Sequence, residues 1–183
     1  MTILHIDSSI TGDASVSRQL TGSIVERLKR DHPGASVVHR DLAADPLPHL
    51  TLEAMGDMTT VDEFLSADAI VIGAPMYNWS LPTQLKSWMD RILVAGRTFK
   101  YTESGPVGLA GGRRVIVALA RGGFYDEGTP MRTLEHVETY LRGVFGIIGI
   151  EPEFVAADGL NVSPEQKELS VRTAMGETIR LAA

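Results

Sequence analysis

A cluster of hydroxyl side chains lies near the start of the chain, between a short apolar run and a segment of helical periodicity. Its five members are Ser8, Ser9, Thr11, Ser15 and Ser17. Hydroxyls, free backbone N–H groups and the positive end of a helix dipole together form a site for an anion such as a phosphate. The alternative is that Ser15 or Ser17 only caps the helix. Neither a Gly-x-Gly-x-x-Gly fingerprint nor a Walker A loop is present, which favours a monophosphate over a dinucleotide.

A stiff aromatic loop follows the most continuous apolar run of the chain, residues 69–74. It reads Pro75-Met76-Tyr77-Asn78-Trp79-Ser80-Leu81-Pro82. Two aromatic rings and an amide between prolines offer flat apolar surface and fixed backbone groups, which a planar heterocycle needs. The alternative is that Tyr77 and Trp79 pack against the neighbouring helix or form a dimer contact.

A glycine pair follows the next apolar run, in the sequence Ala120-Arg121-Gly122-Gly123. Because glycine has no Cβ, the pair lets the backbone approach a ligand closely. A Gly-Gly pair is also common in ordinary turns, so this interpretation depends on the three loops lying together.

The elements that must position these loops alternate between short apolar runs and helix-period segments. Strands are predicted at residues 3–7, 36–40, 69–74, 113–120 and 154–157, and helices at residues 17–30, 61–66, from Pro82 onward, 130–145 and 164–181. This alternation predicts an α/β fold, with a doubly wound, five-stranded parallel sheet and helices on both faces. In such sheets ligands bind at the carboxyl ends of the strands, so the loops after the first, third and fourth strands are expected to meet.

The bulk composition restricts the class of protein. A chain of 183 residues fits one domain over residues 1–183. The net charge of −6 argues against a nucleic-acid partner. No apolar run approaches the roughly 20 residues of a membrane span, and the first residues do not resemble a signal peptide. We therefore expect a soluble, cytoplasmic protein.

Several reaction classes are disfavoured by residues that the chain lacks. It has no cysteine, which excludes disulfides, Cys-ligated zinc, iron–sulfur clusters and cysteine nucleophiles. A serine hydrolase acting through Ser8 or Ser9 is disfavoured because no Gly-x-Ser-x-Gly elbow is present. No metal site is predicted, because no histidine has a partner at metal-ligand spacing along the chain. The five histidines are His5, His32, His39, His49 and His136.

Taken in order, these loops resemble the FMN-binding segments of the flavodoxin-like family of FMN-dependent NADH-azoreductases and NAD(P)H–quinone oxidoreductases. The positions that this resemblance implies at the cofactor are Ser9, Ser15, Val16, Ser17, Met76, Tyr77, Asn78, Trp79, Ala120, Arg121, Gly122 and Gly123. Residues 40–46, 83–86 and 98–106 also resemble family segments, so the similarity runs through most of the chain.

The resemblance implies that FMN is the cofactor, with its phosphate in the first loop and its isoalloxazine ring between the other two. Arg121 would then place positive charge where a reduced flavin carries negative charge. Members of the family are homodimers that reduce quinones and azo dyes with NAD(P)H. One site shared by NAD(P)H and a small aromatic acceptor implies ping-pong kinetics, with no covalent catalytic residue. Tyr101 lies in a segment that reaches the family's active site, or is a structural hairpin tyrosine.

The chain departs from the family pattern at three places. Trp79 replaces the usual Phe, Ala120 replaces the usual Ser, and the segment between Leu50 and Val61 is shorter. The alternative function is an electron-carrier flavodoxin, but the chain lacks the compact Thr/Ser-x-Thr-Gly-x-Thr phosphate loop of that class. A receiver domain needs an acidic residue where this chain has Pro75-Met76.

Overall fold

The computed structural model describes residues 1–181, and at its centre is a five-stranded sheet whose strands all run parallel. The strands are β1 (Thr2–Asp7), β2 (Ser36–Asp41), β3 (Ala69–Pro75), β6 (Arg114–Ala120) and β7 (Glu153–Ala157). Their order is β2-β1-β3-β6-β7. Every residue of the central strand β3 is buried, as its continuous apolar run predicts. The strand order reverses at β1 and β3, so the loops after these strands flank the point where ligands bind in such sheets.

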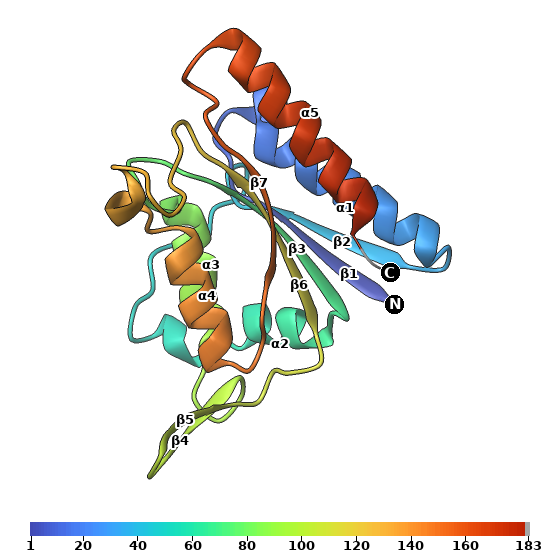
Figure 1. Cartoon of the computed structure of the whole chain (residues 1–183). Coiled ribbons are helices and arrows are strands. Elements are labelled where there is room, and N and C mark those ends of the chain that lie inside the picture. Colours follow the sequence, from blue (N-terminus) through green and yellow to red (C-terminus); the bar gives the residue numbers. More distant parts are fainter. Residues whose placement is uncertain (182–183) are drawn as a thin grey trace.

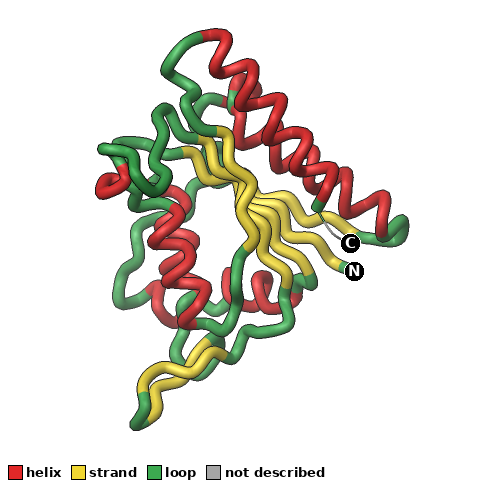
Figure 2. Tube along the Cα trace, in the orientation of Figure 1, coloured by secondary structure: helices red, strands yellow, loops and turns green. Residues whose placement is uncertain are grey.

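Helices cover both faces of this sheet, as Figures 1 and 2 show. On one face, α1 (Val16–Asp31) packs beside α5 (Pro164–Arg180). On the other face lie α2 (Thr59–Ser66), α3 (Thr83–Ile92) and α4 (Glu138–Ile147). The α/β fold predicted from the sequence, with its five-stranded parallel sheet, is confirmed. No helix within residues 1–181 is both long and apolar enough to cross a membrane.

Each layer closes because its helices carry an apolar stripe at helical spacing. Leu20, Ile24 and Leu28 of α1 recur every four residues and lie buried in one core with Val71 and Ile116 of the sheet. The core on the other face contains, from α3, Leu85, Trp88, Met89 and Ile92.

The helix predicted over residues 130–145 is wrong at its start, because α4 begins only at Glu138. The preceding residues form a short 3-10 turn and irregular backbone. The buried carboxylate of Glu135 explains the late start. It accepts hydrogen bonds from the backbone N–H groups of Val137 (3.0 Å), Glu138 (2.8 Å) and Thr139 (2.9 Å), which are free at the first turn of a helix. Glu135 therefore caps α4 at a position that the apolar periodicity had placed within the helix.

A two-stranded antiparallel hairpin, β4 (Phe99–Thr102) and β5 (Gly105–Gly108), projects from the body of the molecule beyond the end of α3 (Figure 1). Gly108 fits closely at its base, because a Cβ there would lie 2.2 Å from the backbone nitrogen of Gly149. The hairpin points away from the carboxyl edge of the sheet, where the three loops gather (Figure 1).

Candidate functional site

The loop after β1 is held in place by its own hydroxyls and by the third-strand loop. Ser15 caps α1, since its side chain accepts a hydrogen bond from the backbone N–H of Arg18, and its Oγ lies 3.1 Å from that of Ser17. Capping is therefore one role of Ser15, as the alternative interpretation proposed. Tyr77 supplies the link to the second loop, because its hydroxyl lies 3.1 Å from Ser9 Oγ and accepts from the backbone N–H of Ile10 at 3.1 Å.

The loop after β3 makes a tight turn at its aromatic residues. Asn78 and Trp79 both adopt left-handed backbone conformations, with φ of 48° and 65°. The flanking residues Tyr77 and Ser80 exchange backbone hydrogen bonds of 2.9 and 3.1 Å, which is the pairing of a two-residue hairpin turn. A left-handed backbone is unfavourable for a residue as bulky as tryptophan. Strain of this kind is characteristic of ligand-binding segments. Trp79 is 47% exposed and so is available to a ligand or a partner chain.

The glycine pair after β6 packs against the loop that follows β7. A Cβ at Gly122 would lie 2.5 Å from the side-chain nitrogen of Asn161, and the backbone N–H of Asn161 donates to the carbonyl of Gly122 at 3.0 Å. Gly123 is tied to the same loop, because its carbonyl accepts from the N–H of Gly159 at 2.9 Å. The missing Cβ of Gly122 is thus accounted for by packing against the Asn161 side chain, without any ligand.

The side chain of Arg121 is buried and paired with acidic side chains. It is 3% exposed and forms two hydrogen bonds of 2.6 and 2.7 Å with Asp158. Glu138 and Glu135 lie 3.3 and 3.6 Å from its Nη1. Burial alone would lower the pKa of the guanidinium, but the hydrogen bonds and charge of Asp158 and the two glutamates raise it. The positive charge of Arg121 is therefore compensated inside the protein, and its expected place beside a reduced flavin stays a prediction.

Two hollows with shared lining residues open at this edge of the sheet. The inner cavity, about 240 Å³, is lined by Ser9, Thr11, Ala14, Ser15, Val16, Pro75, Met76, Tyr77, Ala120, Gly122, Leu160, Asn161 and Lys167. The outer cleft, about 830 Å³, is lined by Ile10, Met76, Tyr77, Asn78, Ser80, Leu81, Pro82, Thr83, Gln84, Lys86 and Tyr140. They share Met76 and Tyr77. One end presents hydroxyls at a helix N-terminus and the other apolar and aromatic surface, so the residues fit a phosphate joined to a planar ring.

The structure thus gathers most of the predicted residues, but not all of them. Ser17 is fully buried under the loop, and Trp79 and Gly123 do not line either hollow. Tyr101 is 76% exposed on β4, which follows the C-terminal end of α3, whereas Thr83 and Gln84 line the cleft at the N-terminal end of that helix. Sequence reasoning missed Asn161 and Lys167, which reach the inner cavity from the loop after β7 and from α5. Neither carries a local sequence signal, because only the parallel pairing of β6 and β7 brings them there.

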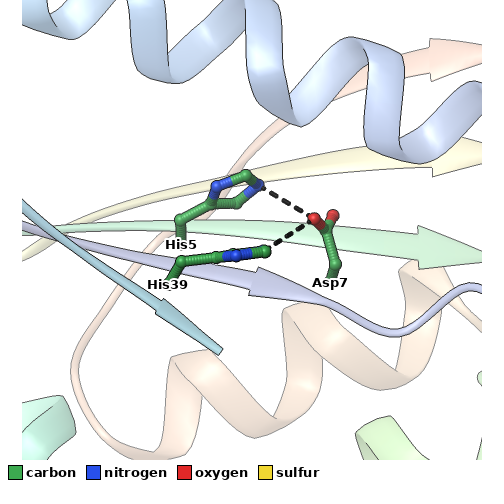
Figure 3. Close-up of side chains that lie close together, drawn as sticks. All are labelled: His5, Asp7 and His39. Atoms are coloured by element: carbon green, nitrogen blue, oxygen red, sulfur yellow. Dashed lines mark hydrogen bonds and ion pairs between the residues drawn. The ribbon is translucent and has the colours of Figure 1, made fainter. Parts of the chain in front are cut away.

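The expectation that all five histidines are isolated is wrong for two of them. His5 on β1 lies directly opposite His39 on β2, and Asp7 lies beside both, as Figure 3 shows. Spacing along the chain could not reveal this cluster, because its members come from two strands.

Comparison with known proteins gives the class of this fold and site. The model of a family described by its flavodoxin-like fold matches residues 1–180. An azoreductase from Bacillus anthracis str. Sterne has a TM-score of 0.90 at 27% identity, covering 99% of this chain and 98% of its own. An FMN-dependent NADH-azoreductase from Bacillus anthracis str. Ames Ancestor, solved in complex with FMN, has a TM-score of 0.85 at 29% identity, covering 100% and 99%. This protein is therefore a flavodoxin-like α/β protein.

Closer relatives define the family within that class. The FMN-dependent NADH:quinone oxidoreductase of Rhizobium meliloti is 48% identical over 207 residues, covering all of both chains. That of Ralstonia nicotianae is 49% identical over 195 residues, covering 95% of this chain and 93% of its own. The chain belongs to the family of FMN-dependent NADH:quinone oxidoreductases.

Proposed function

We propose that this chain is an FMN-dependent oxidoreductase that transfers two electrons from NAD(P)H to quinones or azo compounds. The observation that carries the proposal is the pair of hollows at the carboxyl edge of the sheet, with hydroxyls at one end and aromatic surface at the other. The full-length similarity to oxidoreductases of this kind supports the same reading.

The first loop and α1 would hold the phosphate of FMN. Ser9 and Ser15 line the inner cavity, and the first backbone N–H groups of α1 lie beside them at the positive end of the helix dipole. Lys167 lines the same cavity and adds a positive charge that Arg121, bound to Asp158, does not offer. We expect Lys167 to be the cation that accompanies the phosphate.

The loops after β3 and β6 would hold the flavin ring. Met76 and Tyr77 line both hollows, and Ala120 and Gly122 bring backbone close to the inner one. FMN supplies the two-electron chemistry when bound, and the protein supplies binding, orientation and the exclusion of water. Because the outer cleft is one space, NAD(P)H and the acceptor would occupy it in turn, which gives ping-pong kinetics.

We further propose a homodimer in which the β4–β5 hairpin of one subunit reaches the outer cleft of the other. Tyr101 (76%), Val107 (43%) and Leu109 (42%) are large apolar side chains exposed in this region. Tyr101 is carried by β4, which follows the C-terminal end of α3, whereas the cleft of its own chain is lined by Thr83 and Gln84 at the N-terminal end of that helix. Sedimentation of the purified protein tests the dimer, and a Tyr101→Ala variant with a raised KM for quinone supports the contact. A cytoplasmic location follows from the proposed use of NAD(P)H and is tested by cell fractionation.

The decisive experiment is the visible spectrum of the FMN-reconstituted protein during anaerobic addition of NADH. Flavin bands that bleach fully and return when a quinone is added support the proposal. Failure to bind FMN overturns it. A bound flavin that ignores NADH and is reduced in separate one-electron stages by chemical reductant would instead identify an electron carrier.

A further inference from the structure

A second group of potential ligands lies outside the cofactor site, at the β1–β2 edge of the sheet. His5 and His39 are directly paired in the register of these parallel strands, and Asp7 follows two residues along β1 on the same face (Figure 3). All three side chains point to one spot beside α1. This arrangement does not involve the hollows that would bind FMN and NAD(P)H.

The distances in this cluster match those of a metal site. The Nε2 atoms of His39 and His5 lie 3.0 and 3.3 Å from the same carboxylate oxygen, Oδ2 of Asp7. One ligand atom from each residue lies within 4.8 Å of the others. Zinc binds histidine nitrogen and carboxylate oxygen at about 2.0–2.2 Å in a tetrahedron, so its ligand atoms are about 3.3–3.5 Å apart. The side chains would need only small movements to coordinate such an ion.

The hydrogen bonding of the cluster leaves a coordinating atom free. Nε2 of His5 is buried, and among the described residues its 3.3 Å contact with Asp7 Oδ2 does not have the geometry of a hydrogen bond. A buried polar atom without a partner is costly, and a metal ion would satisfy it. The other carboxylate oxygen of Asp7 accepts a hydrogen bond from Thr21 Oγ1 at 2.9 Å, which fixes Oδ2 toward the histidines. Support of this kind from outside the ligand set is typical of metal sites in proteins.

The charges near the cluster allow a divalent cation. The positive charge of Arg18 would disfavour a cation here, because its Nη1 lies 3.7 Å from Asp7 Oδ2. Its guanidinium, however, forms two hydrogen bonds of 2.7 Å with Asp41. Asp7, Asp41 and Arg18 together carry a net charge of −1 with both histidines neutral. The side chain of His39 is 47% exposed, which gives an ion a path from solvent to the buried atoms.

We propose that His5, Asp7 and His39 bind a divalent transition-metal ion of the zinc class, with water as the fourth ligand. The ion would join the edge strand β2 to β1 directly behind the loop that lines the inner cavity. It would stabilise the fold and take no part in electron transfer. The inference is independent of the proposed function, because it concerns residues that do not line the cofactor site.

Zinc binding to the untagged, chelator-treated protein tests this proposal. Titration calorimetry should show one zinc ion per chain, and zinc at a hundredfold excess over its Kd should raise the Tm by about 5–10 °C. His39→Gln should weaken binding at least about tenfold. His39→Gln is preferred to His5→Gln because the side chain of His39 is partly exposed. We therefore expect the variant to keep its fold. The Tm of the His39→Gln variant, measured in the presence of chelator, checks that the fold persists.

The matched control replaces the three histidines outside the cluster. His32, His49 and His136 are all exposed, and a variant with all three changed to Gln should bind zinc like the wild type. X-ray absorption at the zinc edge should show two histidine nitrogens and oxygen ligands at about 2.0–2.2 Å. Absence of zinc binding would overturn the proposal. So would equal binding by His39→Gln, or loss of binding only in the triple variant. A protein that binds zinc but not FMN would uphold this proposal and overturn the proposed function.

Discussion

Replacing Gly122 by alanine separates two explanations for the glycine pair after β6. One is close approach to a ligand, and the other is packing against Asn161. The backbone at Gly122 does not need glycine, since its φ is not positive. A Cβ would, however, lie 2.5 Å from Nδ2 and 3.1 Å from Cγ of Asn161. Contacts this short force the neighbouring side chain to move.

The expected magnitude follows from how freely Asn161 can move. It is exposed, so its side chain can rotate away from a new methyl group. We therefore expect Gly122→Ala to lower the free energy of unfolding of the flavin-free protein by about 1–2 kcal/mol, at the lower end of overpacking costs. For a chain of 183 residues this lowers the Tm by about 2–8 °C.

A double-mutant cycle provides the control. Asn161→Ala alone should cost about 0.5 kcal/mol or less, because it truncates an exposed side chain. The double variant should recover about 1 kcal/mol relative to the sum of the single changes, since the clash is gone. Urea unfolding of the four flavin-free proteins measures this coupling. Additive effects would refute the packing argument and leave ligand approach as the reason for the glycine.

Four further variants test the site and the elements that support it. Tyr77→Phe removes the hydroxyl that contacts Ser9 and the first loop, and should cost about 1 kcal/mol of stability and about fivefold in FMN affinity by fluorescence titration. Tyr101→Phe is the matched control, because it removes the hydroxyl of an exposed tyrosine, and it should leave the Tm of the flavin-free protein unchanged. Arg121→Met leaves Asp158 and its neighbours without their cation, and should lower stability by about 3–5 kcal/mol in urea unfolding. Burial alone would raise the pKa of Glu135, but hydrogen bonds from α4 lower it, so its contribution to stability is present above about pH 4.5 and is lost as the pH falls further. Wild type should therefore lose more stability than Glu135→Gln between about pH 5 and pH 3 in pH-dependent thermal unfolding, and equal losses would contradict the capping role.

The fold could be predicted from the sequence because its signals are local. The apolar run over residues 69–74 identifies a central strand, and the stripe of Leu20, Ile24 and Leu28 identifies a covering helix. The start of α4 could not be predicted, because it depends on where the Glu135 carboxylate finds backbone N–H groups. The spacing of apolar residues indicates which residues face the core. It does not indicate where a side chain accepts hydrogen bonds from the first backbone N–H groups of a helix.

The site could be predicted only as far as each loop could be interpreted separately. Ser9, Met76 and Tyr77 do lie together in the inner cavity. The pairing of Arg121 depends on Asp158, and the close packing at Gly122 depends on Asn161. Both partners lie in the loop after β7, far along the chain from the glycine pair. The same limitation concealed the pairing of His5 with His39.

The residues that indicated a ligand also have partners within the protein, and the two roles reinforce each other. Ser15 caps α1, Tyr77 ties the loop after β1 to the loop after β3, and Arg121 ties the loop after β6 to α4 and to the loop after β7. Loops fixed in this way lose little conformational entropy when a ligand binds, so more of the contact energy remains as affinity. The left-handed turn at Asn78 and Trp79 persists in the same way, because the paired backbones of Tyr77 and Ser80 hold it. The cofactor site is therefore formed by the fold itself, and cofactor binding should tighten the loops without reordering them.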